Sequence, residues 1–219
     1  MIVAAFYTLY SLRASLISGI GKVAAAFRGG AAAEEVERTE RDLNLRGVFL
    51  AIGVMAIPMF LLYRYFSAST GGALVLTVVM LVLGILFAAV AGYLVGLVGN
   101  SNNPISGLTL SALVIAAVLM VVMGVTGVKG IAAVLGVAGV VCCAAGVAGD
   151  MMQDFKVGHI LGGTPWRMQI GEIIGVAAAA VVLPVLLMVL NQAYGFGSAE
   201  LPAPQAGLMA LMAKGIVGG

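Results

Sequence analysis

Two polar segments interrupt an otherwise apolar chain, and the first holds amide and hydroxyl side chains suited to binding a solute. It runs over residues 99–107 and contains Asn100, Asn102, Asn103, Pro104, Ser106 and Gly107. Asn103 is a good helix cap, and Pro104 would then occupy the first helical position. The free N–H groups of that helix end would attract a carboxylate or another anion. The alternative is an ordinary turn between two helices.

The second polar segment, residues 149–159, carries groups that could handle protons or ions. It contains Asp150, Gln153, Asp154, Lys156 and His159. If the preceding helix continues, Asp150 and Asp154 lie one turn apart on one face. Acidic groups at the end of an apolar span are often proton or ion sites, and histidine readily exchanges a proton near neutral pH. The alternative is a hydrated helix end with a solvated histidine.

Three residues beyond this segment could also lie at a membrane boundary. Glu172 stands near the start of a later apolar stretch, where it would face either the interface or a polar cavity. Trp166 and Arg167 have the residue types of interfacial anchors.

Small residues at a spacing of four predict where helices pack together. One series is Gly84, Ala88, Gly92 and Gly96, and Gly139 and Cys143 repeat the spacing later. The adjacent Cys142 and Cys143 have no CxxC spacing, so we interpret them as small packing residues and not as a metal or redox site.

The elements that must position these residues are membrane helices. Of 219 residues, 62% are hydrophobic and 9% are charged, whereas a soluble domain has roughly 25% charged residues. The small net charge of +2 argues against a nucleic-acid partner. A span needs about 20 mostly apolar residues, and we place five near residues 47–63, 72–99, 105–127, 130–149 and 170–193. The expected fold is all-α, a polytopic transmembrane helix bundle with broken or re-entrant segments.

The remaining segments divide the chain into three parts. Residues 1–27 form an apolar N-terminal segment, either a partial span or an interfacial helix; residues 28–46 form a charged link; residues 47–219 form the bundle portion. The four arginines of the link place it in the cytosol, and its mixed charge predicts a solvated connector. Alternation of the spans then puts residues 98–104 and 150–169 in the cytosol as well. Residues 201–217 begin a further span or a re-entrant segment.

The two polar segments resemble the oligopeptide transporter (OPT) family, in its bacterial form. The matching strings are Asn102-Asn103-Pro104-Ile105-Ser106-Gly107 and Gly149-Asp150-Met151-Met152-Gln153-Asp154-Phe155-Lys156-Val157-Gly158-His159, the latter continuing through Leu161-Gly162-Gly163-Thr164-Pro165. The tail is similar to the bacterial branch over Leu201-Pro202-Ala203-Pro204-Gln205-Ala206. The order and spacing of these strings make the match specific, and it runs from about residue 46 to the end. Family members are considerably longer, so the chain resembles an internal or C-terminal-half portion.

The resemblance implies cation-coupled, usually proton-coupled, uptake of small peptides or peptide-like compounds, some of them metal chelates, by alternating access. It assigns substrate contact and the shaping of the broken segment to Asn102, Asn103, Pro104, Ser106 and Gly107. Its second string matches at Asp150, Gln153, Asp154, Lys156 and Gly158, with Asp150 or Asp154 in the coupling role. The family often has a small polar residue at the position of Val157, so no hydroxyl role is expected there.

Two other classes of function are compatible with a membrane bundle. One is a passive channel or a scaffold. The other is an intramembrane aspartyl protease, which needs a second aspartate on another membrane helix, and no other predicted span has one. We expect no catalytic residues, no cofactor and no metal centre. The expected partners are the lipid bilayer, a small peptide or peptide-like substrate, protons and the remaining helices of a longer chain, in the plasma or inner membrane.

Overall fold

The structure, a computed structural model, describes residue 10 and residues 37–67 and 69–218. Apart from Tyr10, the predicted apolar segment at 1–27 lies outside the described residues, so the predicted division of the chain remains a prediction. The described part contains helices and no strand, which confirms the all-α fold. The helices are α3 (Leu45–Ser67), α4 (Thr70–Val98), α5 (Ile105–Val122), α6 (Gly127–Ile160), α7 (Pro165–Ala193) and α8 (Pro204–Val217), with short 3-10 turns η1 (Arg38–Glu40) and η2 (Asn100–Asn102).

Five of these helices, α3 to α7, are long and apolar enough to cross a membrane. Local signals fix their ends. The Asn44 side chain accepts a hydrogen bond from the Arg46 N–H at 3.1 Å, and the Ser69 hydroxyl accepts one from the Gly72 N–H at 3.4 Å. Each side chain satisfies one of the donors that a helix start leaves free. Gly99 ends α4 with a φ of 84°, which glycine adopts without strain.

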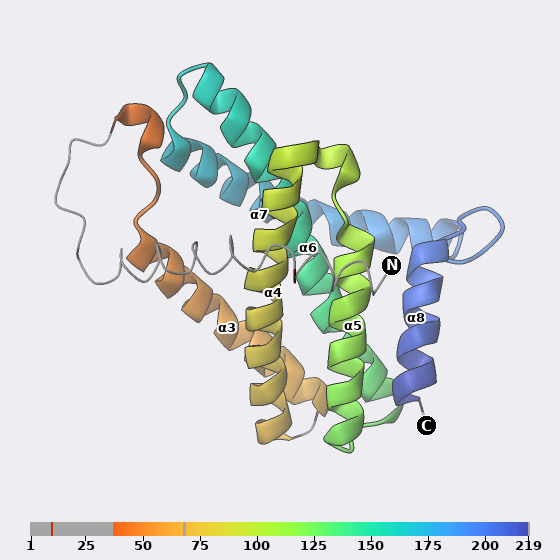
Figure 1. The fold of residues 1–219 in the computed structure, drawn as a ribbon. Coiled ribbons are helices and arrows are strands. Elements are labelled where there is room, and N and C mark those ends of the chain that lie inside the picture. The colour runs from red at the N-terminus through yellow and green to blue at the C-terminus, as the bar shows by residue number, and fades with distance from the viewer. Residues whose placement is uncertain (1–9, 11–36, 68, 219) are drawn as a thin grey trace.

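The core lies between α4, α5 and α6, with α3 and α8 packed around them (Figure 1). Its fully buried side chains include Leu76, Phe87, Leu113, Met120 and Val137. Helix α8 packs on α5 and α6 and buries Ala213 and Val217. Its described part has 14 residues, and whether residues 201–217 begin a further span or a re-entrant segment stays a prediction.

The helices α3 to α6 run alternately up and down, so the polar segments collect at one end of the bundle. Residues 37–44, 98–104 and 161–164 lie at the upper end in Figure 1, and residues 123–126 lie at the lower end. Alternation of the spans along the sequence also predicts that the charged link, residues 98–104 and residues 150–169 share one side of the membrane. At the upper end, a hydrogen bond from Asn100 to Asp150 joins residues 98–104 to α6. Another, from Arg38 to Gly162, joins residues 37–44 to residues 161–164.

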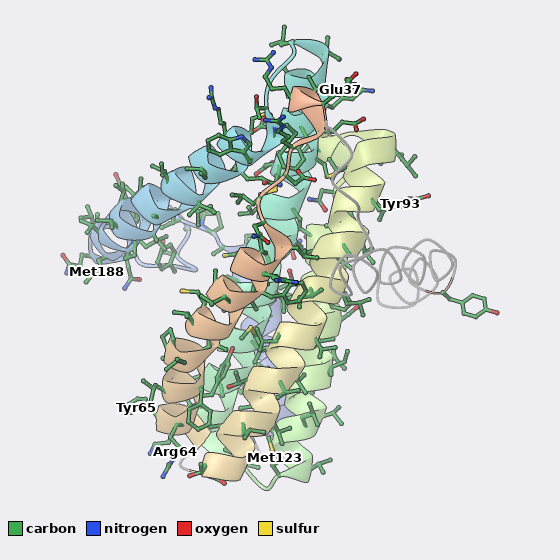
Figure 2. All side chains as sticks on the ribbon, turned by 90° about the vertical axis from the view of Figure 1, so that its left-hand side faces the viewer. Glu37, Arg64, Tyr65, Tyr93, Met123 and Met188 are labelled. Carbon is green, nitrogen blue, oxygen red and sulfur yellow. The ribbon has the colours of Figure 1, made fainter. Side chains whose placement is uncertain are left out.

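Helix α7 leaves the bundle at a steep angle to α4 and α5 (Figures 1 and 2). None of its 29 residues is buried, and it packs chiefly against α6. Its contacts are concentrated in its first two turns, beside the polar end of the bundle.

Two expectations about α6 meet the structure here. A span was predicted over 130–149 with residues 150–169 in the cytosol, and continuation of the helix past residue 149 was left open; the helix continues to Ile160. Polar side chains alone do not end a helix, whereas Gly162 has a φ of 75° and does. The face of Gly139 and Cys143 was expected to pack against another helix, but both residues are exposed. Nearly uniform apolarity around α6 gave no information about which face is buried.

Candidate functional site

The two predicted polar segments meet at the upper end of the bundle. The Asn100 side-chain amide donates a hydrogen bond to the Asp150 carboxylate, and the Asn103 Nδ2 donates to the Ala145 carbonyl at 3.3 Å. Gly149 lies directly under these two asparagines: a Cβ there would be 3.0 Å from the Asn100 Oδ1 and would collide with the Asn103 amide. The side-chain amides of Asn100 and Asn103 therefore bind the α4–α5 connection to α6, and the absence of a side chain at Gly149 leaves room for them.

Asn103 does not have the predicted capping role. Pro104, with a φ of −79° and a ψ of 40°, precedes the first residue of α5 and makes no side-chain cap. The Asn103 side chain turns to α6 instead, because the Ala145 carbonyl offers it an acceptor across the interface. Its Oδ1 is buried and has no hydrogen-bond partner among the described residues. An acceptor of this kind is costly to bury unless a donor reaches it.

The other predicted substrate-contact residues surround this point. The Asn102 Nδ2 donates to the Val98 carbonyl at 3.2 Å and holds the last turn of α4 to η2. Ser106 and Gly107 lie in the first turn of α5, half-buried and buried respectively. The Gln153 Nε2 lies 3.8 Å from the point where a Cβ on Gly99 would be, so Gln153 also faces the break.

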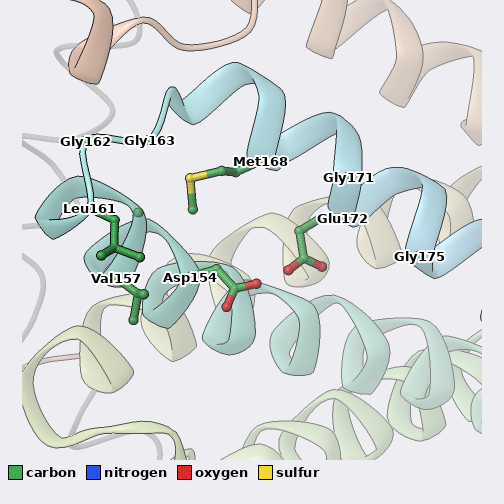
Figure 3. A pocket seen from close by; sticks show the side chains of 10 residues that line it. Asp154, Val157, Leu161, Gly162, Gly163, Met168, Gly171, Glu172 and Gly175 are labelled. Carbon is green, nitrogen blue, oxygen red and sulfur yellow. The ribbon is translucent and has the colours of Figure 1, made fainter.

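The acidic residues of α6 have separate partners. Asp150 and Asp154 lie one turn apart on the continuous helix, as predicted, but Asp150 contacts Asn100 and Asp154 contacts Glu172 of α7. The carboxyl groups of Asp154 and Glu172 lie close to each other at the α6–α7 contact (Figure 3). Glu172 therefore lines the open-sided pocket between α6 and α7, and whether it faces a polar cavity or the membrane interface stays a prediction.

An open-sided pocket of about 710 Å³ lies between α6 and α7 at this carboxyl pair. Much of its wall is glycine, and its lining includes Asp154, Gly158, Gly163, Met168, Gly171 and Glu172 (Figure 3). Met168 packs against Gly158, where a Cβ would collide with its sulfur. The missing side chain at Gly158 thus lets α6 and α7 approach closely.

Lys156 and His159 lie on exposed positions in the last turns of α6. No hydrogen bond or ion pair joins either side chain to another described residue, so the structure does not bring them into the asparagine cluster. No group of three or more His, Cys, Asp and Glu residues in the described part of the chain could hold a metal ion.

No sequence pattern indicated that the charged link contributes to this end of the bundle. Arg38 Nη2 donates to the Gly162 carbonyl at 2.8 Å, and Gln169 of α7 binds Asp42 and the backbone of Leu43. The link was predicted to be a solvated connector, but its described half is hydrogen-bonded to α7 and to the turn before it. Partners more than 120 residues apart in sequence have no local pattern from which to predict them.

Comparison with known proteins shows to which family the chain belongs. The family model described as OPT oligopeptide transporter protein matches residues 1–219. A curated protein of Haemophilus influenzae, named "Putative oligopeptide transporter", is 31% identical over 241 aligned residues. The alignment covers 98% of this chain and 38% of that protein, so the chain spans well under half the length of this relative. No solved structure matches. The five apolar helices and the family match make this an integral, multi-pass membrane protein, and the chain belongs to the oligopeptide transporter (OPT) family.

Proposed function

We propose that this chain forms part of a secondary active transporter that takes up small peptides or peptide-like solutes by proton-coupled alternating access. The plasma or inner membrane is the expected location. One observation supports proton coupling above the others, the facing carboxyl groups of Asp154 and Glu172 in an open pocket between two membrane helices. The family match supports a peptide or peptide-like substrate.

The carboxyl pair can hold and release a proton with a small movement. Two carboxylates close together repel each other when both are ionised, and a shared proton relieves this repulsion. Moving α7 away from α6 would separate the two groups and remove the reason to share a proton. Proton release would thus accompany a helix movement, which is what coupling to alternating access requires.

The asparagine cluster is the proposed substrate contact. The buried, unpartnered Oδ1 of Asn103 would accept a hydrogen bond from a donor such as a peptide N–H. The start of α5 directly beside it has free backbone N–H groups, which favour a carboxylate. A peptide offers both groups, and helix N-termini at polar interruptions contact anionic groups of solutes in other secondary transporters.

The coupling role is tested with Asp154→Asn in the complete transporter, reconstituted in liposomes with an imposed proton gradient. Uptake of radiolabelled di- and tripeptides should no longer respond to the gradient, while expression stays normal, because an amide cannot release the proton. Glu172→Gln should do the same, since its amide can neither share nor release a titrating proton with Asp154. Glu200→Gln, at an exposed loop position, is the matched control and should behave as wild type.

The same assay separates the alternative functions. A channel would give uptake that neither saturates nor responds to the gradient. A protease would leave cleaved peptide in the liposomes, whereas a transporter leaves intact peptide. Gradient-driven uptake by Asp154→Asn, with the pH dependence of wild type, would remove Asp154 from the coupling role.

A further inference from the structure

The described half of the charged link lies against the start of α7. We call residues 37–43 the clasp and residues 161–164 the elbow. Arg38 Nη2 donates to the elbow carbonyl of Gly162 at 2.8 Å. The Trp166 N–H donates to the Arg41 carbonyl at 3.0 Å. Trp166 is in the first turn of α7, and the preceding Thr164 makes no side-chain cap. A distant segment thus satisfies a helix N–H that local sequence leaves free.

Gln169 makes two further hydrogen bonds with the clasp from the same first turns of α7. Its Oε1 accepts from the Leu43 N–H at 2.8 Å, and its Nε2 donates to the Asp42 Oδ1 at 3.1 Å. An amide is the side-chain group that offers one acceptor and one donor in this arrangement. A glutamate would keep the acceptor, lose the donor and place a second carboxylate beside Asp42.

These bonds matter because the described residues restrain α7 almost entirely at this end. None of its residues is buried. Beyond the clasp, its contacts with α6 include Met168 over Gly158 and Glu172 facing Asp154. Glu172 lies three residues after Gln169, on the next turn of the same helix, so whatever fixes Gln169 also fixes the position of Glu172.

We propose that residues 37–43 act as a clasp on α7, with Gln169 as the positioning residue, and that the clasp holds Glu172 against Asp154. The inference rests on the proposed function, because it assigns control of the proton-coupling pair to the charged link. Release of the clasp frees the first turns of α7 and separates the two carboxyl groups. Since residue 43 leads through Asn44 directly into α3, movement of α3 is transmitted to α7 through this contact.

The contact itself is tested by hydrogen–deuterium exchange on the complete transporter in nanodiscs, a measurement that needs no transport. Gln169→Met keeps the side-chain volume and removes both hydrogen bonds. Backbone amides of residues 166–172 should then exchange about tenfold faster, as expected when one part-buried and one exposed hydrogen bond are lost. Gln192→Met, at an exposed site near the other end of α7, should leave these amides at the wild-type rate. Wild-type exchange in Gln169→Met would overturn the clasp.

The link to coupling is tested by peptide uptake in liposomes. Gln169→Met should lower the gradient-driven maximum rate and leave the half-saturating peptide concentration unchanged, since the asparagine cluster is intact. Asp42→Ala should show the same split, whereas Asp42→Asn keeps the acceptor oxygen and should restore wild-type rates. Unchanged rates in both Gln169→Met and Asp42→Ala would overturn control of coupling by the clasp.

The two readouts distinguish the possible failures. If wild type takes up no peptide but Gln169→Met loosens α7, the proposed transport function is wrong and the clasp stands as a structural contact. If wild type takes up peptide and Gln169→Met changes neither exchange nor rate, the clasp is wrong and the proposed function stands.

Discussion

At the residue scale, glycines decide how closely the polar groups approach α6. Gly149 lies under Asn100 and Asn103, and Gly158 lies under Met168. Each occupies a place where a single methyl group would push a neighbour away. The resembling family strings include both glycines, but only the contacts explain why a side chain is excluded there.

Gly149→Ala should destabilise the protein by about 1–3 kcal/mol, because its methyl group would overpack against the two asparagines. Gly139→Ala is the matched control on the same helix, since nothing lies within 4 Å of its Cβ position. That change should be neutral or stabilise by roughly 0.5–1 kcal/mol, through the better helix propensity of alanine. Thermal unfolding midpoints in detergent measure both. A Gly149→Ala midpoint equal to that of Gly139→Ala would mean that the asparagines do not lie as described.

Asn100 and Asp150 provide a second test at this scale. Removing either side chain should cost about 1 kcal/mol, and removing both should cost much less than the sum, because they share one hydrogen bond. A double-mutant cycle of Asn100→Ala and Asp150→Ala, followed by thermal unfolding, measures the coupling. Fully additive losses would show that the two side chains act independently.

At the element scale, the connection between α4 and α5 is a turn between two antiparallel helices at which polar groups gather (Figure 1). Gly99, η2 and Pro104 interrupt two apolar helices at the point where the polar groups gather. The break exposes backbone N–H and C=O groups, which membrane helices tolerate where protein or water can satisfy them.

Pro104→Ala combined with Asn103→Leu should weaken peptide binding. The change alters the start of α5 and removes both the buried acceptor and the hydrogen bond to Ala145. The measurement is the concentration of unlabelled peptide that halves labelled uptake. Pro204→Ala, at the start of α8, is the control for losing a helix-starting proline. Unchanged affinity in the double variant would indicate that this segment is a plain turn.

At the scale of the whole molecule, alternating helices place the clasp, the asparagine cluster and the carboxyl pair at one end of the bundle. Arg38 and Arg41 contact the turn before α7 and its first turn at this same end, and Arg167 is in that first turn. Positively charged residues mark the cytosolic side of membrane proteins. We therefore expect the candidate site to open toward the cytosol in this conformation.

Membrane sidedness is tested with single cysteines in a background of Cys142→Ala and Cys143→Ala. Ser101→Cys should react with an impermeant thiol reagent only after cells are permeabilised, and Thr126→Cys should react on intact cells. The structure places these residues at opposite ends of the bundle. Labelling of both cysteines from the same side would contradict the arrangement of α5.

The sequence alone was enough to predict five spans, the all-α class and the two polar segments. A membrane span can be recognised from local sequence, because it must be apolar along its own length whatever it packs against. The helical placement of Asp150 and Asp154 also followed from local spacing. The end of α6 at Ile160 did not, because helix continuation depends on the glycines beyond the polar residues.

Only the tertiary structure showed which of these residues meet. Glu172 opposite Asp154, Asn103 against Ala145 and Gln169 in the clasp all join positions far apart in the chain. Apolar helices with similar residues on every side contain little information about which face turns inward, as the exposed Gly139 shows. Those pairings are determined by how the helices pack. The free energy of each contact depends on both partners, so neither sequence segment specifies the contact alone.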